Sequence, residues 1–111
     1  MASQQNFVDF IIDQIKDQSR VRYKKMFGEY ALYYDNKVVA LVCDNQLFIK
    51  PTEAGKNFIE ENSKLVEGNP YPGSKLWLLI EDEIENSEFI NELLEITSKE
   101  LPAPKLKAKK K

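Results

Sequence analysis

A doubled turn signal in residues 26–50 constrains the fold of this 111-residue chain more than any other feature. The stretch MFGEYALYYDNKVVALVCDNQLFIK is rich in Val, Tyr, Leu and Phe, and it is interrupted by Asp35-Asn36 and Asp44-Asn45. Asn and Asp tolerate the positive φ angles of a tight hairpin, and β-branched and aromatic residues favour strands. The stretch therefore predicts an antiparallel β-meander.

Alternation within the meander predicts a sheet that is apolar on both faces. In the first full strand one face carries Tyr30, Leu32 and Tyr34, and the other carries Ala31 and Tyr33. In the next strand Val38, Ala40 and Val42 are expected to lie opposite Val39, Leu41 and Cys43. Such a sheet needs cover on both faces, from helices of the same chain or from a second copy. Gly28 predicts a bulge or a close backbone approach at the start of the meander.

Three helical segments flank the strands. Residues 3–18 predict an amphipathic helix capped by Ser3, with a stripe at three- and four-residue spacing that contains Phe7, Phe10, Ile11 and Ile15, widened by Val8 and Ile12. A second helix is expected from Pro51-Thr52 to about Asn62. A third is expected from Asn86 or Ser87 to about Glu100.

The remaining segments complete an α+β domain. Residues 62–68 predict a loop or a short edge strand, Pro72-Gly73 fits the centre of a type II turn, and residues 75–80, KLWLLI, predict a buried strand. The acidic residues at 81–85 predict a solvated loop. Residues 1–104 are thus expected to form one domain. It comprises an antiparallel meander sheet of four to five strands with N-terminal, middle and C-terminal helices.

Charge is distributed unevenly along the chain. The tail, residues 105–111, holds five of the 16 basic residues and none of the 18 acidic ones, which leaves 11 basic and 18 acidic residues, a net charge of −7, in residues 1–104. A domain of that sign is not expected to attract nucleic acid over its whole surface. The lysine-rich tail is predicted to be disordered.

The residue types present argue against an enzyme. Without histidine there is no Ser-His or Cys-His arrangement and no His-based metal site, and a single cysteine excludes an internal disulfide. Cys43 lies among apolar residues and is predicted to be buried and structural. We therefore expect a non-enzymatic chain without cofactor or metal. Without a signal peptide or an apolar run of the ~20 residues that cross a membrane, it is expected to be cytoplasmic.

Several short motifs resemble the N-terminal domain family of the TfoX/Sxy competence regulators. They are Met26-Phe27-Gly28, the strand end at Lys50, and Tyr71-Pro72-Gly73 with Lys75, within a resemblance that covers about residues 7–104. The resemblance implies an α+β domain similar to the two-layer folds of secretion chaperones, in a bacterial cytoplasmic protein. The best-known members act with the transcription machinery to switch on DNA-uptake genes. Full regulators of the family carry a second, C-terminal domain, and this chain resembles the N-terminal domain alone. It therefore looks like a stand-alone form.

Three functions remain open at this point. The first is a regulatory or adaptor module that acts through protein contacts, with the transcription machinery or a second copy as partner. The second is a nucleic-acid-associated protein that meets phosphates through Arg20, Arg22, Lys24, Lys25, Lys105, Lys107, Lys109, Lys110 and Lys111, against the alternative of a solubilising tail. The third is a small-molecule or anion site near Lys50, Pro72, Gly73 and Lys75, against the alternative that these residues only shape turns.

Overall fold

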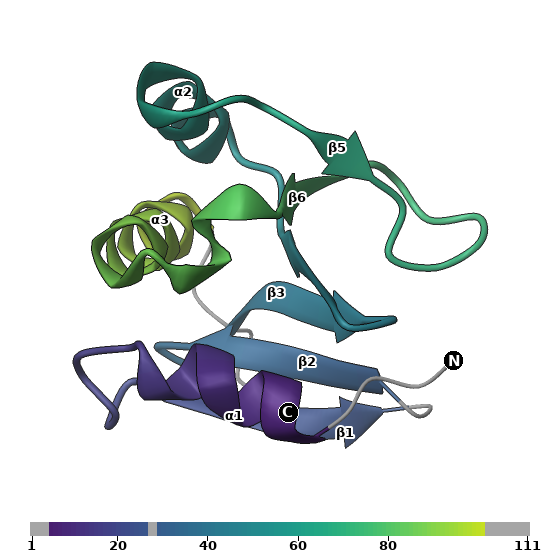
Figure 1. The fold of residues 1–111 in the computed structure, drawn as a ribbon, viewed down its shortest axis with the longest axis vertical. Helices are drawn as coiled ribbons and strands as arrows, with labels where there is room; N and C mark the ends of the chain where they lie inside the picture. The colour runs from purple at the N-terminus through teal and green to yellow at the C-terminus, as the bar shows by residue number, and fades with distance from the viewer. Residues whose placement is uncertain (1–4, 27–28, 102–111) are drawn as a thin grey trace, which may run out of the picture.

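The chain folds into an antiparallel sheet with its helices on one side. The computed structural model describes residues 5–26 and 29–101. In chain order the elements are α1 (Gln5–Asp13), β1 (Val21–Met26), β2 (Glu29–Tyr34), β3 (Lys37–Cys43), β4 (Gln46–Ile49), α2 (Glu53–Asn62), β5 (Glu67–Gly68), β6 (Trp77–Ile80), the 3₁₀-helix η1 (Asp82–Glu85) and α3 (Ser87–Glu100). The strand order is β1-β2-β3-β4-β6-β5 (Figure 1). The α+β prediction is confirmed, with six strands instead of four to five.

Both predicted hairpin turns are confirmed. Asp35 and Asn36 have φ angles of 54° and 66°, and Asp44 and Asn45 both have φ of 57°. Positive φ at both central residues is the signature of the type I′ turn, whose twist matches that of the strands it joins. The two turns set the order β2-β3-β4 directly from local sequence.

One face of the sheet packs against the helices and forms the core. Two rows of paired residues cross the sheet on this face: Tyr30, Val42, Leu47 and Ile80, and beside them Leu32, Ala40, Ile49 and Leu78. They share one hydrophobic cluster with side chains of all three α-helices, including Val8, Ile11, Ile59, Ile90, Leu93 and Leu94. Among the described residues, no helix is long and apolar enough to cross a membrane.

A β-bulge in β3 overturns part of the predicted alternation. Leu32 pairs with Ala40 but the next residue, Tyr33, pairs with Val38, so that Val39 is the extra residue. The bulge places Val39 in the core, fully buried, and moves Val38 to the opposite face with Leu41 and Cys43. The bulge predicted at Gly28 falls outside the described residues.

The N-terminal helix is shorter than predicted and buries a narrower stripe. It ends at Asp13, and two turn bonds, from Gln14 N to Ile11 O and from Ile15 N to Ile12 O, carry Ile15 into the core. Phe10, which was predicted to be buried, is 40% exposed. It precedes Ile11 by one residue and so lies about 100° away around the helix. The predicted cap, Ser3, lies outside the described residues.

The two later helices begin where the sequence predicts. The Thr52 hydroxyl accepts a hydrogen bond from Gly55 N (3.0 Å), and the Asn86 side chain accepts one from Phe89 N (3.1 Å). A further cap was not predicted: the Glu100 carboxylate, at the end of α3, accepts hydrogen bonds from Glu53 N (3.0 Å) and Ala54 N (2.9 Å) at the start of α2. The positive end of the helix dipole, at the start of α2, also stabilises a carboxylate there.

Of the two connections beside β6, one differs from expectation and the other is confirmed. Residues 82–85, predicted to be a solvated loop, form η1, because Ile84 packs against the core and draws the segment into a turn of helix. The type II turn is confirmed: Gly73 has φ of +86°, and Ser74 N donates to Tyr71 O (3.1 Å).

A polar cluster centred on Arg20 ties the β2–β3 turn to α3. The Arg20 guanidinium donates to both carboxylate oxygens of Asp35, at 2.8 and 2.5 Å, and to Glu95 (2.8 Å). It also lies 4.4 Å from the centre of the Tyr34 ring. Hydrogen bonds from Arg20 hold the pKa values of the Asp35 and Glu95 carboxyls below their usual range.

Replacing Arg20 by glutamine is expected to lower the free energy of unfolding by about 1 kcal/mol at pH 7, since the ion pairs remain partly exposed. Because the pKa values of these two carboxyls are lower in the folded chain than the unfolded value of about 4, the ionised carboxylates stabilise the folded chain above that pH. This contribution is lost as the pH falls through the pKa values of the folded chain. The difference between wild type and Arg20→Gln should therefore shrink below about pH 4. Urea unfolding at pH 7 and pH 3 measures it, and an equal difference at both would contradict the ion-pair origin.

A buried hydroxyl in α3 offers a simple gain in stability. Thr97 Oγ1 is buried and has no hydrogen-bond partner in the part of the chain that the structure describes. An unpaired buried polar group costs ~1–3 kcal/mol, and valine has nearly the same shape without the hydroxyl. Thr97→Val is expected to raise the free energy of unfolding by about 1 kcal/mol. Thr97→Ser, which keeps the hydroxyl and loses the methyl group, should lower it in the same urea titration.

Candidate functional site

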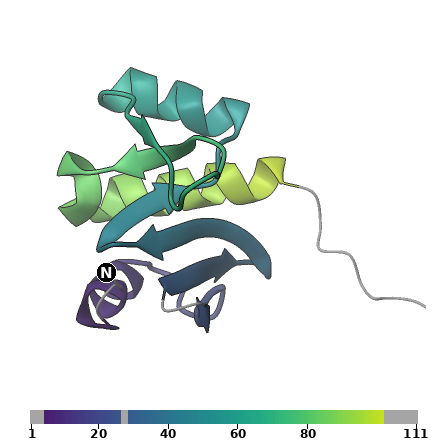
Figure 2. The same ribbon diagram turned by 90° about the vertical axis from the view of Figure 1, so that its right-hand side faces the viewer.

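The face of the sheet turned away from the helices is the candidate site. We call it the open face, and it carries Arg22, Lys24, Ala31, Tyr33, Val38, Leu41, Cys43, Phe48, Trp77 and Leu79. The loop between β5 and β6, residues 69–76, lies on this side, opposite α3 (Figure 2). The prediction of a second apolar face is therefore confirmed, and this loop covers part of it.

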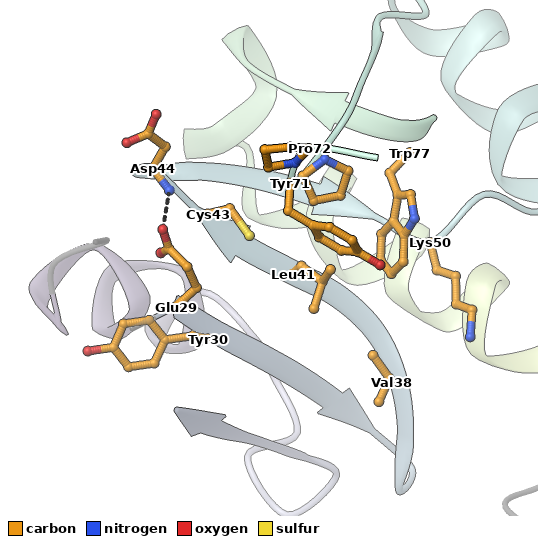
Figure 3. Close-up of a pocket in the computed structure, with 11 residues that line it drawn as sticks. Glu29, Tyr30, Val38, Leu41, Cys43, Asp44, Lys50, Tyr71, Pro72 and Trp77 are labelled. Carbon is orange, nitrogen blue, oxygen red and sulfur yellow. Dashed lines mark hydrogen bonds between the residues drawn. The ribbon is translucent and has the colours of Figure 1, made fainter. Parts of the chain in front are cut away.

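A hollow of about 890 Å³ lies between the loop and the open face. Figure 3 shows Val38 and Leu41 of β3, Tyr71 and Pro72 of the loop, and Trp77 of β6 around it. The tyrosine is 54% exposed and the other four side chains give the hollow a largely apolar wall. Concave apolar surfaces of this kind are typical of binding sites.

The loop over the hollow is braced by its own turn. Gly73 supplies the positive φ that the type II turn requires, and Asn69 Nδ2 donates to Ser74 O (2.8 Å) across the loop. Pro70 is buried, which anchors the start of the loop, while Tyr71 projects from it. The loop thus holds Tyr71 and Pro72 in position at the hollow.

The ends of the hollow differ in charge. Lys50, which follows β4, lies at one end, and Glu29 and Asp44 lie at the other (Figure 3). The Glu29 carboxylate accepts a hydrogen bond from the backbone N–H of Asp44 (3.2 Å), which fixes the acidic end. Tyr30 also borders the hollow, but its ring points away from it (Figure 3) and lies on the helical side of the sheet.

Cys43 borders the hollow, and its thiol is buried. It is 7% exposed, and burial, followed by the nearby Glu29 and Asp44 charges, raises its pKa to about 11. A nucleophilic cysteine needs the opposite, a lowered pKa that yields thiolate near neutral pH. The predicted burial of Cys43 is confirmed.

Alkylation should report this state of Cys43 directly. At pH 8 the folded chain is expected to react with iodoacetamide at least about tenfold more slowly than the urea-unfolded chain, because a raised pKa leaves little thiolate. The sign of the shift also requires the folded rate to rise steadily toward pH 11. Equal rates for folded and unfolded chains would contradict a buried, protonated thiol.

The structure brings together some of the predicted motif residues and separates others. Lys50, Tyr71 and Pro72 border the same hollow, and Gly73 shapes the turn beside it. Lys75 is exposed and is not among the residues that border the hollow. The backbone of Met26 ends β1, and Phe27 and Gly28 lie outside the described residues.

The four described residues that were predicted to contact nucleic acid do not lie on one face of the sheet. Arg20 is held by Asp35 and Glu95, as described above. Arg22 lies over the Tyr33 ring at 4.6 Å on the open face, and Lys24 and Lys25 are exposed on β1. The tail lysines, Lys105, Lys107, Lys109, Lys110 and Lys111, lie outside the described residues. Within the described ranges, no group of three or more His, Cys, Asp or Glu residues is placed to hold a metal ion.

Trp77 and Val38 were not predicted as site residues. The tryptophan carried a signal, since a large aromatic in a short strand next to a Pro-Gly loop favours a contact surface. Val38 carried none, because it reaches the open face only through the bulge at Val39.

Comparison with known proteins identifies the family. The chain is 46% identical over 105 residues to a Spirochaeta aurantia protein described as an uncharacterized 12.7 kDa protein in the trpE 5′ region, a match that covers 95% of this chain and 89% of that protein. Residues 13–89 match the family model of the TfoX N-terminal domain. The matched range includes all six strands and every residue that borders the hollow. The chain therefore belongs to the TfoX N-terminal domain family.

Proposed function

We propose that this chain is a non-enzymatic regulatory adaptor that acts through protein contacts, in the cytoplasm of a bacterium. The observation that carries the proposal is the apolar hollow on the open face, with Leu41 at its floor and Tyr71 and Trp77 at its wall. The centres of protein interfaces are enriched in aromatic residues and depleted of charge. Membership of the TfoX N-terminal domain family supports a regulatory role.

The partner that fits is a protein that inserts an apolar side chain into the hollow. A carboxylate beside that side chain would pair with Lys50 at the basic end, and a basic group would be repelled there but accepted near Glu29. The polar ends would fix the orientation of the inserted segment, while the apolar wall would supply most of the affinity.

Capture of partners by the tagged full chain in its own cells tests the proposal, provided that a matched pair of variants is included. Leu41→Glu places a charge in the hollow, and Asn57→Glu places the same charge on the exposed surface of α2. Wild type and Asn57→Glu are expected to enrich the same protein, and Leu41→Glu, checked for folding by circular dichroism, should lose it. Enrichment of one set of proteins by all three chains would overturn the proposal.

Self-association is the other protein contact that an open apolar face permits. Light scattering over a range of concentrations distinguishes it: a dimer that Leu41→Glu dissociates, and Asn57→Glu does not, would make a second copy the occupant of the hollow. A monomer throughout would leave a different protein as the partner.

Nucleic-acid binding is a second candidate, favoured by the lysine-rich tail and by the exposed Lys24 and Lys25. If all five tail lysines met phosphates of duplex DNA, the slope of log K against log salt would be roughly −4 to −5. Fluorescence anisotropy with the full chain, and with a variant in which the five lysines are glutamines, measures this slope. Absence of binding by the full chain at 50 mM salt would remove this candidate.

A further inference from the structure

We propose that the outer edge of β1 binds an extended acidic segment of a partner protein, which adds to the sheet as a further strand. Strand β1 is an edge strand, and within residues 5–26 and 29–101 no other strand pairs with its outer edge. At six residues it is long enough to pair with a peptide, unlike the two-residue β5 at the opposite edge. None of the residues that border the hollow comes from β1, so this surface is separate from the one proposed above.

The hydrogen-bonding pattern shows which backbone groups face outward. Asp35 N donates to Arg20 O (2.8 Å), so this pair occupies a hydrogen-bonded position of the β1–β2 ladder. Such positions alternate along antiparallel strands, and in this register Arg22 pairs with Tyr33. The N–H and C=O groups of Val21, Tyr23 and Lys25 therefore point away from β2. They offer alternating donors and acceptors, which is what a peptide strand requires.

The side chains along this edge select the chemistry of the added strand. Arg22 and Lys24 lie exposed on the open face, and Lys25 lies exposed on the other face beside Tyr23, which is 39% exposed. The Tyr23 ring packs edge-on to the Tyr30 ring at 5.7 Å, which holds it in place. Residues directly opposite on neighbouring strands share a face and interact. Acidic residues opposite Arg22 and Lys24, with an apolar residue between them opposite Tyr23, would match all three.

Charge argues against a second copy of β1 at this edge, and the pattern of outward hydrogen-bonding groups argues against nucleic acid there. Antiparallel pairing of two β1 strands would bring Arg22, Lys24 and Lys25 close to the same cations of a second copy, and like charges across strands destabilise a sheet. Edge lysines in fact protect strands from such self-pairing. Nucleic acid would place phosphates, which only accept hydrogen bonds, against the outward carbonyl oxygens that alternate with the donors, whereas the N–H groups of a peptide strand pair with those oxygens.

A matched pair of variants in the full chain tests strand addition. The probe is a labelled eight-residue peptide that alternates glutamate with valine, titrated by fluorescence anisotropy. Because the N–H of Lys25 points outward, Lys25→Pro removes an edge donor without breaking the ladder with β2, and Lys25→Ala removes the same charge but keeps the donor. We expect Lys25→Pro to bind the peptide at least tenfold more weakly than Lys25→Ala. Equal affinities, or no binding by wild type at millimolar peptide, would overturn the proposal.

A second measurement keeps the test decisive if Lys25→Pro does not fold. In an added strand, alternate N–H groups of the peptide face β1 and the others face water. Two N-methylated peptides separate these sets: one lacks the N–H groups that would face β1, and the other lacks those that would face water. One peptide is expected to lose at least tenfold in affinity and the other to bind as before. In addition, the double variant Arg22→Glu/Lys24→Glu should prefer a lysine–valine peptide. Equal effects of both methylation sets, or displacement of the peptide by duplex DNA at lower concentration than by unlabelled peptide, would contradict strand addition.

Discussion

Leu32→Ala is expected to lower the free energy of unfolding by about 3 kcal/mol, within the ~2–5 kcal/mol range of large-to-small substitutions in cores. Leu32 is 1% exposed and lies in β2 on the helical side of the sheet, where it pairs with Ala40 and belongs to the core cluster. Removing its side chain leaves a cavity between the sheet and the helices. Urea unfolding monitored by circular dichroism measures the loss.

The matched control is Leu41→Ala, one strand away on the open face. Leu41 is only half-buried, because the hollow lies above it, so little of its packing is lost on truncation. We expect this variant to lose about 1 kcal/mol or less. Equal losses for the two leucines would mean that the open face is packed like the core, and this would contradict the division of the sheet into a packed face and an open face.

The second large effect is expected at Gly55, where α2 approaches the rest of the domain closely. A Cβ at this position would lie 2.7 Å from Thr52 Oγ1, 3.5 Å from Thr97 Oγ1 and 3.6 Å from Leu78 Cδ1. Thr52 cannot turn away freely, because its buried hydroxyl caps the helix through Gly55 N. Gly55→Val should therefore either break the cap or push α2 from α3, at a cost of about 3 kcal/mol.

Asn57→Val provides the control for this substitution. Asn57 is exposed on the same helix, and asparagine and valine have similar helix propensities, so the free energy of unfolding should change by about 0.5 kcal/mol or less. Thermal or urea unfolding of both variants separates helix propensity from packing. A Gly55→Val chain as stable as Asn57→Val would show that α2 can move without loss, contrary to the close approach seen here.

Local signals account for the parts of the fold that the sequence predicts well. Positive φ at both residues of each hairpin turn requires residues such as Asp and Asn, so Asp35-Asn36 and Asp44-Asn45 place the strands of the meander with little dependence on the rest of the chain. The N-caps at Thr52 and Asn86 are equally local, because each side chain bonds an N–H three residues ahead.

Features that depend on distant contacts could not be predicted in the same way. The bulge at Val39 has no local marker, since Val38 and Val39 suit either face of a sheet equally well. The capping of α2 by Glu100 joins residues 46 and 47 positions apart, and the ion pairs of Arg20 span 15 and 75 positions. Only the folded chain brings these groups together.

The candidate site was predictable in composition but not in shape. Alternation predicted a second apolar face, and the motif residues Lys50, Tyr71 and Pro72 proved to border one hollow. The position of the loop over β3, and with it the role of Trp77, follows from the pairing of β6 with β4. That pairing joins strands separated by helix α2 and the edge strand, and no local pattern specifies it.

Photo-crosslinking from the open face tests most directly whether it is a protein contact surface. A benzophenone amino acid replaces Val38 beside the hollow or, as the control, Asn57 on the outer surface of α2, and the full chain is irradiated in its own cells. The expected result is a discrete adduct with one partner protein from position 38, absent from position 57 and abolished by adding Leu41→Glu. Adducts that are the same from both positions, or unchanged by Leu41→Glu, would contradict the assignment of the hollow as the contact surface.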